Sequence, residues 1–467
     1  MSIAETLRRE RSPGGKLGIA MLIAALLVIP LFSIYLLNWD RQSQSNTASA
    51  SIVEGWGGPQ TIAGPVLVIP YQAQSRETVV DGGKQVTKTS TVWRELVLSP
   101  ETSTLDTRIA PERRKRSIYE AVVYETTLTG QAKFVMPTDL ERIGVPVTSL
   151  VFARAEIRFG LSDARGLFGA PPAVRINGKA LKLEPGHGLG ATNGSGFFAW
   201  HDASALPAGP MVADFDYRFR GSDSITLAPR AGDTTWKVTS IWPSPSFQGG
   251  FLPTTRSVSD KGFSATYRVG NLALGQSLVN ANDNTVQAPS DRKGMSSYVE
   301  TAGGTSQGAA SISLVQPVDV YSQVNRATKY GFLFIGFTFL ALLMFDVIGG
   351  VRVAGVEYLL VGIGLVLFFA LLLAFAEVIG FTLAYIIASG AIIGLITAYS
   401  AAVLKSWKRA GYIGGLLTAL YAVLYILLSL EAYSLLIGSL MLFVALAGVM
   451  YVTRKLDWGA PREAAAV

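Results

Sequence analysis

Residues of the types that perform acid–base or metal chemistry are scarce in this chain. Its 467 residues include two histidines, His187 and His201, and no cysteine. The lack of cysteine excludes a disulfide, a cysteine-ligated zinc and a thiol nucleophile. Adjacent side chains in a strand point to opposite faces, which separates His201 from Asp202. A metal site usually needs three or four clustered ligands, so we expect no metal, no cofactor and no histidine-based catalysis.

Two glycine-rich stretches and one carboxylate pair are the remaining candidates for chemistry. A phosphate-binding loop follows a strand and opens a helix. Neither residues 186–190 nor residues 194–196 are placed in this way. Asp214 and Asp216 share one face of an expected strand, where such a pair could do acid–base work. Two arginines continue that face, so we interpret it as a charge-balanced, solvated surface. We expect no catalytic residue and no enzymatic activity.

Carboxylates also occur beside the apolar runs of the chain. Asp346, Glu377 and Glu431 each lie at the end of such a run. A proton or ion pathway normally shows charges buried in the middle of a span. We interpret all three as interfacial carboxylates, which disfavours a transporter.

The composition indicates an integral membrane protein. Hydrophobic residues make up 49% of the chain and charged residues 16%, against roughly 25% charged residues in soluble domains. Residues 17–37 form the first apolar run, which reaches about 30 Å as a helix, the thickness of one hydrocarbon core. The small-residue sequence at 48–50 lies too far beyond this run to mark signal-peptide cleavage. We expect an uncleaved anchor, followed by a short separate helix over residues 40–55.

Residues 38–328 contain most of the turn-forming sequences of the chain and no further apolar run that could span a membrane. Short segments rich in β-branched and aromatic residues recur, which predicts strands. Asn177-Gly178 lies between two of them and predicts a type I′ hairpin. We expect an α+β membrane protein with a large antiparallel β-sandwich-like domain between its first and second spanning helices.

The remainder of the chain predicts a helical bundle over residues 329–452 and a tail over 453–467. Five apolar segments follow the domain, at about 330–348, 357–376, 379–403, 412–430 and 432–452. With the first helix they make six spans. Basic residues concentrate on cytoplasmic loops, and the charges here place residues 1–16 and the tail in the cytoplasm and the domain in the periplasm. These charges are Arg8, Arg9, Arg11, Lys16, Arg352, Lys405, Lys408, Arg409, Arg454, Lys455 and Arg462.

The net charge of +7 does not predict nucleic-acid binding. Residues 38–328 contain 28 basic and 25 acidic residues, so most of the excess comes from loops that flank apolar runs. The densest basic run, residues 113–116, is interpreted as a solvated turn before a strand that begins near Ile118. The expected partners are the lipid bilayer and an unidentified envelope protein or polymer, and the oligomeric state stays open.

Two turn-rich motifs predict an interaction or membrane-docking surface. They are residues 56–65 (WGGPQTIAGP) and residues 242–253 (WPSPSFQGGFLP). Rigid glycine–proline loops and tryptophans that we expect to be exposed suggest a ligand groove or a docking loop. The candidate residues are Trp56, Gln60, Trp242, Phe247 and Phe251. At the junction of domain and bundle, we expect Arg326, Lys329 and Tyr330 to couple the two.

Five stretches together resemble the CreD family of bacterial inner-membrane proteins. They are the two motifs above and QPVDVY at 316–321, RATKYGFLFIGFTF at 326–339 and TRKLDW at 453–458. The resemblance implies an inner-membrane role in cell-envelope integrity and brings no assigned reaction. Two alternatives stay open: an insertase of the YidC type, by analogy of layout alone, and a periplasmic enzyme acting on glycan.

Overall fold

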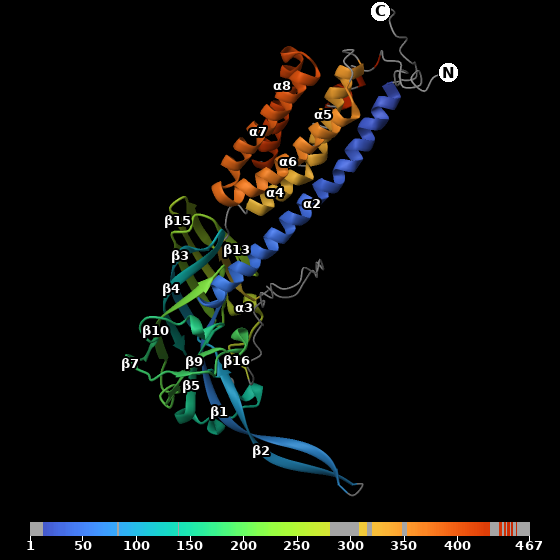
Figure 1. Cartoon of the computed structure of the whole chain (residues 1–467). Helices are drawn as coiled ribbons and strands as arrows, with labels where there is room; N and C mark the ends of the chain where they lie inside the picture. Colours follow the sequence, from blue (N-terminus) through green and yellow to red (C-terminus); the bar gives the residue numbers. More distant parts are fainter. Residues whose placement is uncertain are drawn as a thin grey trace, which may run out of the picture. The chain divides into compact units, whose positions relative to one another are not determined.

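The computed structural model describes residues 13–81, 84–138, 140–280, 308–314, 320–347 and 353–429, with short pieces between 439 and 454. The chain divides into two compact units. One is helical and combines Met1–Asn46 with Val318–Val467, and the other is β-rich and comprises Thr47–Pro317. Each is described here by itself (Figure 1).

Five helices in the described part of the chain are long and apolar enough to cross a membrane, one N-terminal and four C-terminal. The sequence predicted six, and the sixth, at 432–452, lies mainly outside the described residues. Tyr330 interrupts the second of the five between α4 and α5. The helices are α2 (Pro13–Glu54), α4 (Val320–Lys329) with α5 (Gly331–Val347), α6 (Gly355–Ile379), α7 (Phe381–Val403) and α8 (Trp407–Ser429).

The first helix is longer than the sequence suggested. We expected a span ending at residue 37 and a separate helix over 40–55, but α2 is one helix of 42 residues. No glycine or proline occurs between Leu31 and Glu54, so nothing interrupts the helix there. At ~1.5 Å per residue it is about 63 Å long. The boundary between the two units falls inside it, after Asn46.

Glycines allow the helices of the bundle to approach closely. A Cβ atom added at Gly362 on α6 would clash with the Leu27 side chain of α2. One added at Gly331, at the start of α5, would lie 2.8 Å from Leu31 Cδ1. Small residues at helix contacts are typical of membrane bundles, where close packing takes the place of the hydrophobic effect. These contacts hold α2 against α5 and α6.

The β-rich unit contains two sheets. The first has the order β13 (Pro245–Gly249), β17 (Ala310–Leu314), β11 (Ser224–Ala228), β1 (Gln60–Asp81), β5 (Ala155–Leu161), β9 (Gly196–His201) and β8 (Glu184–Pro185), with β2 (Lys84–Leu98) pairing with β1 and β16 (Val279–Asn280) with β2. The second has the order β14 (Thr255–Ser259), β15 (Gly262–Gly270), β12 (Asp233–Ser240), β3 (Thr102–Arg116), β4 (Tyr119–Phe134), β10 (Met211–Ser222), β6 (Ala173–Ile176) and β7 (Lys179–Ala180).

One hydrophobic core joins the two sheets. Phe159 of the first sheet packs edge-on against Phe215 of the second, with ring centroids 5.4 Å apart. Trp236 is fully buried in the same core. The expectation of purely antiparallel sheets is wrong for two strand pairs, because β1 runs parallel to β11 and β3 parallel to β12. These partners are far apart in the sequence, so no hairpin dictates their direction.

Two local predictions in the second sheet had opposite outcomes. The Asn177-Gly178 hairpin is confirmed, since both residues have positive φ, 48° and 83°. The predicted turn at 113–116 is wrong. These four residues end β3 and pair with β4, and the turn lies at Ser117 and Ile118. Their charges are compatible with a strand because they have partners: Lys115 Nζ, for example, lies 2.6 Å from Glu120 Oε1.

A long hairpin of β1 and β2 extends beyond the rest of the first sheet (Figure 1). Its pairing runs from Leu67 opposite Leu98 to Asp81 opposite Lys84. On its other edge, β1 pairs with β5 only as far as Val68. Beyond that residue the hairpin is two-stranded, apart from an isolated bridge between Tyr71 and Leu150.

Candidate functional site

Trp56, in the first predicted motif, follows the last residue of α2 by two positions. Its ring is stacked between two guanidinium groups, Arg114 at 3.7 Å and Arg220 at 4.0 Å from the ring centre. Its indole N–H donates a hydrogen bond to the Tyr124 carbonyl at 3.3 Å. Cation–π contacts gain strength when they are partly desolvated, and Trp56 is half-buried. Trp56 therefore attaches the end of α2 to the second sheet.

The hairpin between β3 and β4 also contacts α2. Ser49 Oγ donates a hydrogen bond to the Glu120 carbonyl at 3.1 Å. Arg116 Nη1 donates another to Ser51 Oγ at 2.8 Å. Together with the Trp56 stack, these bonds fix the last turns of the helix within the β-rich unit.

Gln60, in the same motif, is a buried structural link and is only 1% exposed. Its amide nitrogen donates to the carbonyls of Arg220 and Asp163, at 2.8 and 3.1 Å. Its amide oxygen accepts from Ser162 Oγ and from the Asp163 N–H, at 3.1 and 3.2 Å. A Cβ atom added at Gly166 would lie 2.7 Å from the Gln60 nitrogen, so this glycine leaves room for the amide. The Asp163 carboxylate accepts hydrogen bonds from Arg165, which lower its pKa below the ordinary value.

The second predicted motif also packs inward. Trp242 is buried, 6% exposed, and belongs to the core shared by the sheets. Phe247 lies edge-on to Phe263 at 5.9 Å, and Phe251 packs against the same core. The expectation that the tryptophans of the two motifs are exposed is wrong, because both rings cover the β-rich unit itself.

The basic run links the two motifs. The Arg113 guanidinium lies 5.4 Å from the centre of the Trp242 ring, and that of Arg114 lies 3.7 Å from Trp56. Neighbouring residues of a strand point to opposite faces, so one strand reaches both tryptophans. No local pattern indicated this arrangement, since the run lies about 50 residues from one motif and over 100 from the other.

The predicted coupling residues lie at the end of α4. Arg326 is half-buried, Lys329 is exposed, and the Tyr330 N–H donates to the Ala327 carbonyl at 3.1 Å as the chain turns into α5. Tyr321, on the same helix, makes the better-defined contacts. Its carbonyl accepts from Asn38 Nδ2 at 3.1 Å, and its hydroxyl donates to Glu377 Oε1 at 3.2 Å.

Two of the three carboxylates near the apolar runs have partners within the helical unit, and the third, Glu431, lies outside the described residues. Asp346 forms an ion pair with Lys16 of α2 at 2.6 Å, and its side chain is only 1% exposed. Glu377 lies 3.9 Å from Arg41 Nε, also on α2. Asp346 is therefore a buried and paired group, and its position at the membrane interface stays a prediction. Removing one partner of a buried ion pair is strongly destabilising, so Lys16 and Asp346 fasten α2 to α5.

A chain of charged groups that the sequence did not reveal crosses the first sheet. Glu156 Oε2 accepts from Arg158 Nε at 2.7 Å and lies 3.0 Å from His187 Nδ1. Arg158 also forms two hydrogen bonds with the Glu95 carboxylate, at 2.7 and 2.9 Å. Burial alone lowers the pKa of Arg158, but its bonds to Glu95 and Glu156 outweigh burial and raise it. Within the described residues no group of three or more histidines and carboxylates could hold a metal ion.

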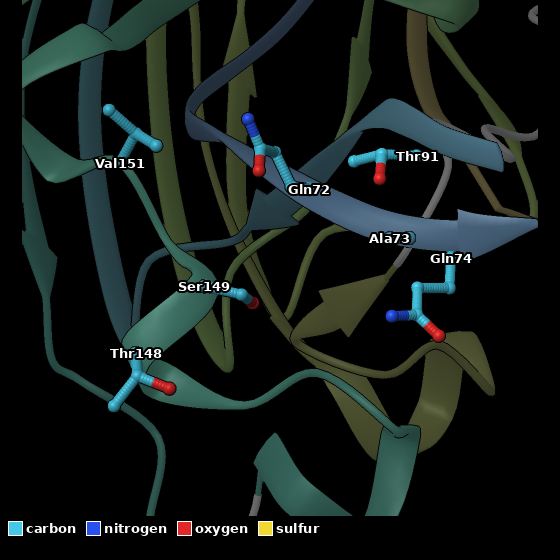
Figure 2. A pocket seen from close by; sticks show the side chains of 7 residues that line it. All are labelled: Gln72, Ala73, Gln74, Thr91, Thr148, Ser149 and Val151. Carbon is cyan, nitrogen blue, oxygen red and sulfur yellow. The ribbon is translucent and has the colours of Figure 1, made fainter.

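A cavity of about 410 Å³ lies at the base of the β1–β2 hairpin (Figure 2). Three segments line this cavity: β1, β2 and the loop before β5. The lining residues are Gln72, Ala73, Gln74, Thr91, Thr148, Ser149 and Val151. None of the seven is charged, and none lies in a motif that the sequence singled out.

Comparison with known proteins places this arrangement in a family. The family model described as "Inner membrane protein CreD" matches residues 12–459. The curated inner membrane protein CreD of Escherichia coli (strain K12) is 34% identical over 446 residues, which cover 93% of this chain and 91% of that protein. The match includes the apolar helices and the β-rich unit between them. The chain thus belongs to the CreD family of multi-pass inner-membrane proteins.

Proposed function

We propose that this chain is a non-enzymatic protein of the cell envelope. In this proposal six helices span the inner membrane, both termini are cytoplasmic, and the β-rich unit, Thr47–Pro317, is a periplasmic β-sandwich that binds or scaffolds an envelope component. The distribution of basic residues supports the orientation, because the cationic loops at Arg352 and at Lys405–Arg409 would then share the side of the N-terminus.

The attachment of α2 to the β-rich unit is the observation that carries the proposal. A catalytic domain on a membrane anchor needs only a flexible tether. Here Trp56 is stacked between two arginines, and Ser49 and Ser51 bond the hairpin beside it. The last turns of α2 are thus part of the fold of the β-rich unit, which suits a domain that binds or scaffolds an envelope component.

The absence of turnover is part of the proposal. The most reactive-looking group, Glu156, already accepts a hydrogen bond from Arg158 and faces His187. A carboxylate oxygen that already meets two side chains of its own sheet has less capacity left to accept a hydrogen bond from a substrate. This arrangement favours a structural role for the group.

In-cell photocrosslinking tests the proposal. A photoreactive phenylalanine analogue would replace exposed apolar residues of the β-rich unit, Ile241 and Leu252, which are 69% and 64% exposed. Trp407, which is 74% exposed, is the matched control, since it begins α8 on the proposed cytoplasmic side. Mass spectrometry should find envelope proteins or polymers on the first two and not on the third. Adducts with cytosolic proteins at Ile241 would contradict the proposal.

A further inference from the structure

The cavity at the base of the β1–β2 hairpin has the chemistry of a sugar site. Five of its seven lining residues carry an amide or a hydroxyl group: Gln72, Gln74, Thr91, Thr148 and Ser149. Amides and hydroxyls can both donate and accept hydrogen bonds. The volume of about 410 Å³ falls in the range of small-molecule sites, roughly 300–1,000 Å³.

Most of these polar groups are available to a ligand. The side chains of Gln72, Gln74, Thr91 and Thr148 have no hydrogen-bond partner among the residues that the structure describes. Ser149 Oγ donates to the Pro146 carbonyl at 2.7 Å and keeps its acceptor capacity. A hydroxyl-rich ligand can satisfy all of these groups, whereas an ionic ligand would lose hydration without meeting an opposite charge among the lining residues.

Trp93 adds an apolar platform beside the cavity. It pairs across the hairpin with Gln72, and cross-strand partners share a face of the sheet. Its side chain is 55% exposed, unusually high for so large an apolar residue beside a cavity. The C–H face of a sugar ring packs well on a flat indole, while the hydroxyls at the ring edge bond to polar groups nearby.

The loop that lines the cavity also orients the tryptophan. Thr148, Ser149 and Val151 contribute the wall, and Arg154, three residues on, places its guanidinium 5.6 Å from the centre of the Trp93 ring. The Val151 N–H donates to the Pro70 carbonyl at 2.9 Å, which ties the loop to β1. The platform and the polar wall are thus held together before a ligand arrives.

We infer that this cavity binds a neutral oligosaccharide, with the sugar ring stacked on Trp93 and its hydroxyls bonded to the glutamines and threonines. The inference deepens the proposed function and rests on it, because it names the class of envelope component and the site. A peptide is the competing occupant. The β1 edge beyond Val68 could pair with an extended peptide. The uncharged wall of amides and hydroxyls offers no apolar pocket for the side chains of such a peptide, and this favours a sugar.

Isothermal titration of the full-length protein in lipid nanodiscs tests the inference. Nanodiscs are required because glycoside detergents are themselves sugars. The titrants are chitotetraose, a sulfated tetrasaccharide and an uncharged polar decapeptide. We expect saturable binding of chitotetraose and at least tenfold weaker binding of the sulfated sugar.

The matched control is another exposed tryptophan of the same sheet. Trp200 lies on β9, is 47% exposed, and is separated from β2 by β1 and β5. Trp93→Ala should weaken chitotetraose binding at least tenfold, and Trp200→Ala less than twofold. Thr148→Val, which keeps the side-chain shape, should weaken it several-fold with unchanged circular dichroism and thermal midpoint.

Three results would overturn the inference: no saturable binding of the neutral sugar, equal losses in the two tryptophan variants, or tight binding of the decapeptide instead. Envelope adducts in the crosslinking experiment would then leave the proposed function standing. Sugar binding at Trp93 without any envelope adducts would support the sugar site and contradict the proposed envelope function.

Discussion

At the scale of single residues, the β-rich unit depends on a few buried polar side chains. Gln60 joins the loop at Asp163 to the end of β10 through four hydrogen bonds from one amide. Glutamine is usually a surface residue, so its type gave no hint of this burial. The motif that contains it was predicted as a surface because glycine, proline and tryptophan are common in exposed loops. Here the same residues shape the space around the amide.

Gln60→Leu should reduce the free energy of unfolding of the β-rich unit by about 3 kcal/mol, because a buried unsatisfied polar group costs ~1–3 kcal/mol and several would be left without partners. Chemical denaturation of the full chain, followed by tryptophan fluorescence, measures the loss. Gln131→Leu is the control, since Gln131 is exposed and makes one side-chain bond, to Asp214. Similar losses in both variants would show that Gln60 is no structural link.

At the scale of elements, the last turns of α2 are stabilised by tertiary contacts rather than by their own sequence. The stretch from Asn46 to Ser51 is rich in serine, threonine and alanine, and has no apolar stripe of its own. Serine and threonine are modest helix formers, and short isolated helices are marginal in water. The contacts of Ser49, Ser51 and Trp56 with the β3–β4 hairpin supply what the sequence lacks.

Trp56→Ala should therefore loosen the end of α2 while the rest of the β-rich unit stays folded. Losing the two cation–π contacts, each worth ~0.5–2 kcal/mol, should raise amide hydrogen exchange over residues 47–54 by at least tenfold. Trp56→Phe keeps an aromatic face but loses the bond to the Tyr124 carbonyl, and should show a smaller increase. Unchanged exchange in the alanine variant would mean that the stack does not hold the helix.

The elements also show what a sequence can and cannot predict. The five long apolar helices and the Asn177-Gly178 hairpin follow from local patterns and were predicted. The strand at 113–116 was missed, because four consecutive basic residues resemble a solvated turn until their cross-strand and aromatic partners are known. The cavity beside Trp93 was missed for the same reason. Its walls combine the β1–β2 hairpin with a loop more than 50 residues further along the chain, and no local pattern connects them.

At the scale of the whole molecule, the lack of cysteine makes topology directly testable. Any cysteine that is introduced is the sole thiol of the protein, so labelling has no background. Gly209 is a suitable site in the β-rich unit, since a Cβ atom there has open space around it. Lys408, exposed in the first turn of α8, and Ala464, in the tail, report on the proposed cytoplasmic side.

A membrane-impermeant maleimide should label Gly209→Cys in cells whose outer membrane alone is permeabilised. It should label Lys408→Cys and Ala464→Cys only after the inner membrane is broken. Because the sixth predicted span lies between the last two sites, labelling of Ala464→Cys from outside would mean an odd number of spans. Protection of Gly209→Cys in the first experiment would place the β-rich unit in the cytoplasm.

The unbroken course of α2 gives its sequence a constraint that a loop would not have. Asn38 and Arg41 contact the helical unit, and Ser49 and Ser51 contact the β3–β4 hairpin. Within the β-rich unit, Ser49, Ser51 and Trp56 all meet partners on the second sheet. A residue inserted between Ser51 and Glu54 would rotate the helix before it by about 100° relative to Trp56. The serines and the tryptophan could then not meet their partners together, so this part of the helix tolerates no change of length.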